Sequence, residues 1–297
     1  MSLPSFAAAD LFGRLNGAVA LVTGGGTGIG LYASRALAAN GAKVYITGRR
    51  LEKLNEAVEI HGKGLPGSLV ALQLDVTDKA QLEKVAAEVR AKDGRLDVLI
   101  NNSGIAGPVT KFENGVKDAQ EYSSKHLSNE SFEQWTNVFN TNVAAVFFST
   151  MTFLPLLEAG LKKPFREGFT PSVINITSIS GTVKTAQNHF AYNSSKAAAT
   201  HLTKMLSHEI NYGHKAAPGI RVNSIAPGLF PSEMTSSGSQ KGGHTEENDV
   251  SIAPPNGKVG TASEMASAVL FLVNNTFMQG QNVHVDGGWI TIVPSSA

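Results

Sequence analysis

The segment Ala20–Ala38, ALVTGGGTGIGLYASRALA, joins a short apolar run to a glycine-rich turn and then to a helical pattern. Gly24, Gly28 and Gly30 suit a backbone that bends tightly and approaches a ligand closely. A helix that begins at such a turn presents unpaired N–H groups and the positive end of its dipole to a phosphate. Counted from Gly24, the spacing differs from G-x-x-x-x-G-K-[ST] and from G-x-G-x-x-G, although a late G-x-G-x-x-A match spans Gly28–Ala33. The segment predicts a nucleotide-binding strand, turn and helix.

The rest of the chain alternates short apolar runs with helical patterns. Near-continuous runs of valine, isoleucine and leucine are typical of strands buried on both faces of a parallel sheet. Right-handed crossovers between such strands place helices on both faces. We therefore predict a single α/β domain over residues 1–297, with a core of about residues 15–290 and a doubly wound, mostly seven-stranded parallel sheet. The predicted strands are Ala18–Thr23, Lys43–Thr47, Leu69–Leu74, Val98–Asn101, Ser172–Ile176, Arg221–Ile225 and Gln281–Val285, and the predicted helices include Leu31–Asn40 (ending at Gly41), Lys79–Lys92, Phe132–Leu157, Tyr192–Tyr212 and Ser263–Val273.

Composition narrows the functional classes. The formal net charge of the 297 residues is +1, which favours neither a nucleic acid nor a membrane surface as partner. The absence of cysteine excludes disulfides and thiolate catalysis. The N-terminus lacks the pattern of a signal peptide, and the apolar stretch Val143–Leu157 is too short to span a bilayer. Glycosylation sequons at Asn101, Asn175 and Asn193 lie in expected core or site segments, so we expect a cytoplasmic protein.

Two long segments depart from the alternating pattern. Residues 105–130 are polar and irregular, and residues 235–256 are rich in glycine, serine and charge. Long loops in a compact domain are often lids or binding loops, and plain disorder is the alternative. We expect variable substrate-side segments at 105–130 and 229–258, with a lid at residues 235–256 inside the second.

Polar residues at the ends of the next strands indicate the nucleotide. The second strand ends at Gly48 and Arg49 instead of an acidic residue; an arginine there can pair with a 2′-phosphate, which favours NADP(H) over NAD(H). The alternative is a solvated basic helix start. Asp75 can meet the adenine amino group or can simply precede a helix cap. Asn101 and Asn102, in LINNSG, suit either a ligand crevice or hydrogen bonds between strands.

A candidate reacting centre follows the fifth strand. The stretch VINITSISG ends that strand with hydroxyl groups, among them Ser178. Tyr192 and Lys196 are four residues apart, so a helix places both side chains on one face. A neighbouring ammonium group lowers the pKa of a phenol, which makes Tyr192 a usable proton donor or acceptor. A tyrosine and a lysine at this spacing often occur by chance. Their position after the glycine turn, Asp75 and the asparagines is much less common by chance.

These motifs in this order resemble the short-chain dehydrogenase/reductase superfamily, in the compact form typical of 3-oxoacyl-[acyl-carrier-protein] reductases. The resemblance covers about residues 15–290 through TGGGTGIG, LDVTD, NNSG, NTNVAAVFF, ITSISG, YNSSK, RVNSIAPGLFPSEM and VHVDGGW. It implies a Rossmann fold and hydride transfer between NADP(H) and a small-molecule carbonyl or secondary alcohol. The implied catalytic residues are Asn142, which supports a proton-relaying water, Ser178, which polarises the carbonyl, Tyr192, which exchanges the proton, and Lys196, which tunes Tyr192. The implied cofactor-binding residues are Gly24, Gly26, Thr27, Gly28, Ile29, Gly30, Arg49, Asp75, Val76, Asn102, Tyr192, Lys196, Phe230 and Ser232.

The sequence also departs from the family pattern. Ser103 replaces the usual alanine of N-N-A-G, and Thr27 stands where NADP-preferring members often carry a basic residue, so the NADP(H) prediction rests on Arg49. The resemblance implies a homo-oligomer, a dimer or homotetramer, with Phe132–Leu157 and Tyr192–Tyr212 as interface helices. A catalytically silent NADP(H)-sensing regulatory protein is the alternative function. No metal site is expected, because no H-E-x-x-H motif occurs.

Overall fold

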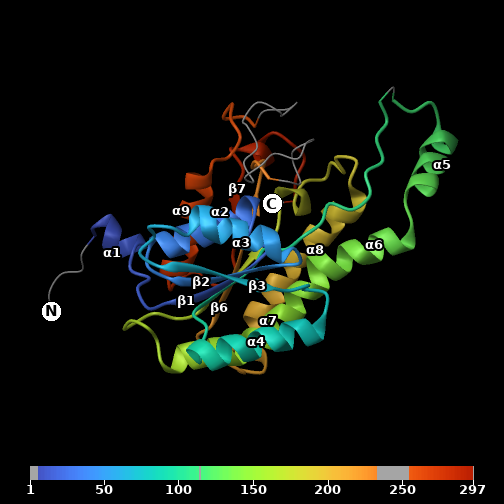
Figure 1. Ribbon diagram of the computed structural model, residues 1–297. Helices are drawn as coiled ribbons and strands as arrows, with labels where there is room; N and C mark the ends of the chain where they lie inside the picture. Colours follow the sequence, from blue (N-terminus) through green and yellow to red (C-terminus); the bar gives the residue numbers. More distant parts are fainter. Residues whose placement is uncertain (1–5, 114, 233–253, 297) are drawn as a thin grey trace.

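A single parallel sheet organises the computed structural model, which describes residues 6–113, 115–232 and 254–296. Its strand order is β3-β2-β1-β4-β5-β6-β7 (Figure 1), so the predicted α/β Rossmann fold is confirmed. Each observed strand begins and ends within two residues of its prediction. The strands are β1 Val19–Thr23, β2 Lys43–Gly48, β3 Ser68–Gln73, β4 Val98–Asn101, β5 Ser172–Ile176, β6 Arg221–Pro227 and β7 Asn282–Val285.

Helices cover both faces of the sheet because its strands are apolar on both sides. In β1, Ala20 and Val22 join one buried cluster with residues of α2, α3 and α9, while Val19 and Leu21 join a second cluster with residues of α4, α7 and α8. Figure 1 shows α2 and α3 on the opposite side of the sheet from α4 and α7. The helices are α1 Ala8–Phe12, α2 Gly28–Ala39, α3 Leu51–His61, α4 Lys79–Asp93, α5 Ala119–Asn129, α6 Phe132–Phe139, α7 Ala145–Lys162, α8 Phe190–His208 and α9 Ala262–Asn274, with π-helical turns η1 Asn140–Ala144 and η3 Glu209–Gly213 and 3-10 turns η2 Ile179–Gly181 and η4 Trp289–Thr291.

The strand order creates a crevice beside β1. This strand pairs with β2 on one side and with β4 on the other, so the connections on its two sides leave the sheet in opposite directions. Ligands of open α/β sheets bind at such a switch point, beyond the carboxyl ends of the strands. The glycine turn after β1 and the polar ends of β2 to β5 all face this edge. Gly41, with φ +99°, follows α2 and fits the predicted helix end.

Residues 105–113 and 115–130 are more regular than the sequence prediction of an irregular segment. They contain α5, whose first turn is capped by the Asp118 carboxylate accepting a hydrogen bond from the Glu121 N–H at 2.8 Å. Phe112 stacks on Tyr122, with ring centroids 5.1 Å apart, and so ties the incoming chain to the helix. Figure 1 shows α5 at the end of an extension that leaves the sheet and returns through α6. We call the described residues 105–113 and 115–130 the arm.

The long helix from Phe132 to Lys162 combines α6, η1 and α7. By length and composition it is the one helix among the described residues that could cross a membrane, and 44% of its most apolar window is buried. Phe153, Leu156 and Leu157 of this helix are fully or almost fully buried in the core beside α4. Its apolar character is therefore explained by packing in the fold. The predicted lid, residues 235–256, lies mostly outside the described residues, which resume at Pro254.

Candidate active site

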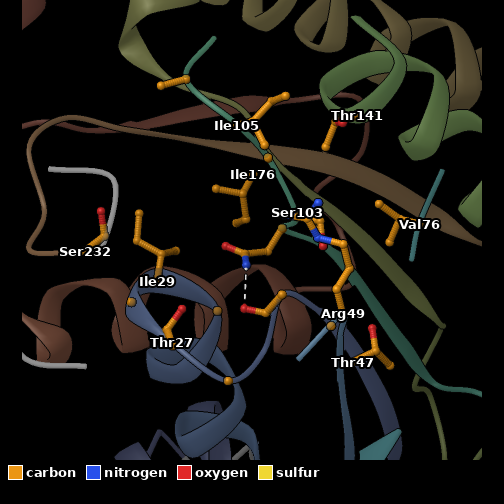
Figure 2. A pocket seen from close by; sticks show the side chains of 18 of the residues that line it. Thr27, Ile29, Thr47, Arg49, Val76, Ser103, Ile105, Thr141, Ile176 and Ser232 are labelled. Carbon is orange, nitrogen blue, oxygen red and sulfur yellow. Dashed lines mark hydrogen bonds between the residues drawn. The ribbon is translucent and has the colours of Figure 1, made fainter. Parts of the chain in front are cut away.

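A cleft of about 930 Å³ lies at the carboxyl edge of the sheet and brings the predicted residues together. Figure 2 shows Thr27, Ile29 and Ser232 at one end of the cleft, Ile176 between, and Arg49 and Val76 toward the other end. Of the catalytic and cofactor-binding residues that the resemblance implies, only Asn142 does not line it. The lining includes Gly24, Gly26, Thr27, Gly28, Ile29, Gly30, Arg49, Asp75, Val76, Asn102, Ser178, Tyr192, Lys196, Phe230 and Ser232.

The glycine turn forms a close-fitting cradle at the start of α2. Gly24 and Gly28 have φ values of +64° and +49°, which favour glycine. A Cβ atom on Gly30 would lie 2.1 Å from the Gly24 carbonyl oxygen, so that position requires glycine too. No side chain caps α2 at Thr27, which leaves its first N–H groups directed at the cleft. These features fit the pyrophosphate of a dinucleotide.

Asn102 connects the cradle to the end of β4. Its side-chain amide donates to the Thr23 carbonyl oxygen at 2.9 Å and to the Gly24 carbonyl oxygen at 3.1 Å. Asn101 instead hydrogen-bonds Thr150 and Asn175 in the interior. Each of the two predicted alternatives therefore applies to one asparagine. Asn102 shapes the ligand crevice, and Asn101 forms hydrogen bonds between neighbouring elements. Asn101 and Asn175 are 4% and 1% exposed, which leaves no room for a glycan at either sequon.

The far end of the cleft carries Arg49 and Asp75. Arg49 follows directly after β2, and its carbonyl oxygen accepts a hydrogen bond from the Gln73 side chain at 2.9 Å. Asp75 accepts hydrogen bonds from the N–H and the hydroxyl of Thr77, at 2.9 and 2.7 Å. Asp78, rather than Thr77, caps α4. Asp75 thus lines the cleft, and Asp78 caps the helix.

Ser178, Tyr192 and Lys196 meet beyond the end of β5. Helix α8 begins at Phe190, so Tyr192 and Lys196 share a face, as their spacing predicted. Lys196 Nζ donates to the Ile176 carbonyl oxygen at 2.9 Å and lies 5.6 Å from the centroid of the Tyr192 ring. The Ser178 hydroxyl accepts a hydrogen bond from the Ser180 N–H at 3.1 Å. The group can position a carbonyl oxygen between a hydroxyl and a phenol.

The pKa of Tyr192 departs from the sequence prediction. Burial raises it above its ordinary value of 10.0, and interaction with the Ser178 hydroxyl lowers it only in part. Burial also lowers the pKa of Lys196 to about 8, so this ammonium group is still largely charged at pH 7. The predicted lowering of the phenol pKa by Lys196 is therefore wrong for the chain alone, because desolvation is the larger effect.

Asn142 stands behind the cleft, in the π-helical turn η1. Its side-chain amide donates to the Ile105 carbonyl oxygen and to the Ser195 hydroxyl, each at 3.0 Å, and its own oxygen accepts from the Ile105 N–H at 2.9 Å. A Cβ atom on Gly104 would be 3.2 Å from Asn142 Oδ1 and 3.5 Å from Lys196 Nζ. Asn142 thus holds the start of the arm, at Ile105, against α8. Its contact on the helix is Ser195, the residue next to Lys196.

Sequence reasoning missed two features near this group. His189 lies beside Tyr192, with ring centroids 6.3 Å apart, and its spacing of three residues before Tyr192 was the available signal. The Glu130 carboxylate hydrogen-bonds Thr110 and His126 in the arm and Trp135 in α6. No local sequence pattern indicated these contacts. Among the described residues no group of His, Asp and Glu side chains is arranged to hold a metal.

Comparisons with known proteins identify the family of the chain. A sequence model of the short chain dehydrogenase family matches residues 18–242. The chain is 36% identical over 304 residues to the short-chain dehydrogenase/reductase PhomF of Diaporthe leptostromiformis, covering 99% of this chain and 98% of that protein. It is 32% identical over 280 residues to the 3-oxoacyl-[acyl-carrier-protein] reductase FabG of Thermotoga maritima, covering 93% and 99%.

Solved structures add the same fold. The structure of an active-site complex of Pseudomonas aeruginosa RhlG with NADP superposes with a TM-score of 0.75 at 28% identity, covering 94% of this chain and 98% of that one. The family match extends over most of the chain, and the cradle and the Ser178, Tyr192 and Lys196 group occupy one cleft. The chain belongs to the short-chain dehydrogenase/reductase family and is an NAD(P)-dependent oxidoreductase that acts on small molecules.

Proposed function

We propose that the protein is an NADP(H)-dependent ketoreductase, similar to 3-oxoacyl reductases, with Tyr192 as its proton donor and acceptor. The observation that carries this proposal is the meeting of Ser178, Tyr192 and Lys196 at the end of β5, in the same cleft as the glycine cradle. Hydride transfer needs a carbonyl held beside both a cofactor site and a proton source. This cleft combines the two.

In the proposed reaction each of the three residues acts at a defined atom. The Ser178 hydroxyl and the Tyr192 phenol hydrogen-bond the substrate carbonyl oxygen. The glycine cradle would hold NADPH, which would supply the hydride for the reduction. As negative charge develops on the oxygen, the Tyr192 phenol transfers its proton to it and an alcohol forms. The Lys196 ammonium stabilises the phenolate that remains, and oxidation of an alcohol reverses the same transfers.

The protonation states of the free chain favour reduction. A raised pKa keeps Tyr192 protonated at neutral pH, which is the form that donates. Lys196, with a pKa of about 8, is mostly cationic at pH 7 and can offset the buried phenolate. The tyrosine is therefore prepared to give a proton to a ketone rather than to remove one from an alcohol.

The preference for NADP(H) over NAD(H) rests on Arg49. No acidic residue follows Gly48 at the end of β2, where a carboxylate would accept hydrogen bonds from the ribose 2′-hydroxyl. Arg49 lines the cleft at this point, and a guanidinium group suits a 2′-phosphate. The relative RhlG, solved as a complex with NADP, supports the same proposal.

We also propose a cytoplasmic homo-oligomer, a homotetramer built on α7 and α8. Phe147 and Phe148 are each 40% exposed on α7, and Met205 is 50% exposed on α8. Exposed apolar side chains on helices suit an interface between subunits. The buried sequon asparagines support a compartment without glycosylation. A catalytically silent NADP(H) sensor is not favoured, because Asn142, Ser178, Tyr192 and Lys196 are all present.

The test is oxidation of NADPH by the full chain over a panel of ketones and 3-oxo esters, with NADH in parallel. We expect turnover of at least one ketone and a several-fold higher kcat/KM with NADPH. Tight binding of NADPH without turnover across the panel would instead support the sensor. A several-fold preference for NADH would overturn the assignment of Arg49.

A further inference from the structure

His189 immediately precedes α8, and its ring lies beside the ring of Tyr192. His189 has non-helical backbone angles, whereas Tyr192 and Lys196 share one face of the helix. Lys196 lines the cofactor cleft, and His189 does not. The His189 ring meets the Tyr192 ring at 6.3 Å with an interplanar angle of 64°. His189 therefore contacts Tyr192 from outside the lining of the cofactor cleft.

The imidazole of His189 lies within electrostatic range of Lys111 and has unused hydrogen-bonding capacity. Neither ring nitrogen has a hydrogen-bond partner among the described residues, although the side chain is only partly exposed. The positive charge of Lys111 is close enough to lower the pKa of His189 further below the value set by burial. No acidic side chain in the described part of the chain forms an ion pair with Lys111 or His189.

The arm holds this pair in place. The Thr110 N–H donates to the Asn188 carbonyl oxygen at 3.1 Å. This bond joins two loop segments and holds the backbone at Lys111 close to the backbone at His189. The Thr110 hydroxyl in turn donates to Glu130 at 2.8 Å, and Thr110 is 2% exposed. Glu130 also binds the Trp135 indole N–H and the His126 ring, each at 2.8 Å. The Glu130 carboxylate is thus already hydrogen-bonded to groups of the arm and α6.

The backbone before His189 is also constrained. Gln187 and Asn188 have φ values of +53° and +65°, two successive left-handed residues that are not glycine. Such conformations persist where the surroundings enforce them, and they concentrate at functional sites. Here the Ser180 hydroxyl donates to the Gln187 side chain at 3.1 Å, and the Asn193 amide donates to the carbonyl oxygens of Thr185 and Ala186. The bend directs His189 toward Tyr192.

We propose that His189 and Lys111 form a recognition site for a carboxylate carried a few bonds from the reacting carbonyl of the substrate. This inference rests on the proposed ketoreductase function and names the substrate class as oxo acids. An imidazole N–H and an ammonium group, adjacent and without an acidic partner, offer two donors and positive charge to one anionic group. A neutral ester at the same place gains neither charge-assisted hydrogen bond.

The test compares 3-oxobutanoate with its methyl ester, which differ in charge but share the reacting ketone. kcat/KM is measured for the wild-type chain with NADPH, and for His189→Phe, which keeps an aromatic ring against Tyr192, and Lys111→Met, which keeps the aliphatic stem. We expect the wild type to prefer the acid. Each variant should reduce the ratio of acid to ester on the order of tenfold, chiefly through KM for the acid.

The control is Lys125→Met, which removes another lysine of the arm, one that lies 4.8 Å from the centroid of the Phe112 ring. It should leave the ratio unchanged. Equal losses on acid and ester in both site variants would reveal a purely structural role and overturn the inference. So would a wild-type chain that reduces the ester but shows no preference for the acid, an outcome that leaves the ketoreductase proposal standing. No reduction of any carbonyl would overturn both.

Discussion

Lys196 Nζ lies 2.9 Å from the carbonyl oxygen of Ile176, the last residue of β5. The lysine comes from α8, and the strand it meets leads two residues later to Ser178. One hydrogen bond therefore aligns the helix that carries the phenol with the strand end that carries the serine. Lys196 has a structural task as well as an electrostatic one, and variants at this site separate the two.

Replacing Tyr192 with phenylalanine removes the proposed proton donor and keeps the ring. We expect kcat for ketone reduction to fall by about 10²- to 10⁴-fold, the usual contribution of a positioned general acid. Binding of NADPH, measured by fluorescence titration, should change little. Tyr212→Phe, at a tyrosine that is 67% exposed, is the matched control. Full ketone-reducing activity in Tyr192→Phe would eliminate the proposed role.

Arg49→Ala tests the origin of the nucleotide preference. We expect KM for NADPH to rise by about tenfold or more, because a charge-assisted contact with the 2′-phosphate is lost. KM for NADH should stay nearly constant, since NADH has no group for the arginine to bind. Lys63→Ala removes an exposed cation that pairs only loosely with Glu59, at 3.9 Å, and should affect neither nucleotide. Parallel rises for both nucleotides would contradict a 2′-phosphate contact.

Lys196→Met is expected to stabilise the fold while it abolishes activity. Burial lowers the pKa of Lys196 from 10.5 to about 8, so between these values the unfolded chain binds more protons than the folded one. Stability contributed by this site therefore rises with pH across that window and is lowest below pH 8. We expect the free energy of unfolding of Lys196→Met to exceed that of the wild type by about 1–3 kcal/mol at pH 7. This difference should shrink toward pH 10.

Urea denaturation of the cofactor-free protein at pH 7 and pH 9.5 measures this gain. Lys204→Met, at an exposed position on the same helix, should show no pH-dependent difference from the wild type. A destabilised Lys196→Met at pH 7 would mean that the hydrogen bond to Ile176 outweighs the cost of burying the charge.

Gly30→Ala should disrupt the cradle. The added Cβ would lie 2.1 Å from the Gly24 carbonyl oxygen, and the backbone has to move to accept it. We expect a loss of about 1–3 kcal/mol in stability and at least tenfold weaker NADPH binding. Gly64→Ala makes a useful comparison, because its Cβ meets nothing within 4 Å although φ is +75°. It should cost about 1 kcal/mol of stability and leave nucleotide affinity intact.

Local patterns were sufficient for the sheet and for the cleft. Runs such as Val98–Asn101 are buried on both faces, and the pattern and the structure agree on their limits. Tyr192 and Lys196 could be paired because helical spacing alone brings them to one face. Asp75 and Arg49 follow strand ends, and parallel strands bring such ends to one edge.

Contacts between distant segments could not be predicted in the same way. Glu130 gathers partners from the arm and α6, and nothing in its sequence neighbours distinguishes it from a solvated glutamate. The same holds for α5, which has no buried residue and depends on Asp118 and the stack of Phe112 with Tyr122. The pKa of Tyr192 was predicted in the wrong direction because burial depends on the whole fold.

The position of β1 also governs the order in which the protein can fold. Its two neighbours, β2 and β4, are separated by the whole of β3 and α4, so the crevice beside it cannot close until residue 101 has been made. Parallel pairings of this range fold slowly, since a long loop must be ordered before its contacts form. On the ribosome, β1, β2 and β3 can assemble first and wait with one edge of β1 unpaired. The crevice beside β1 thus forms only after β4, and the cleft is completed later still, when the residues up to Ser232 have been made.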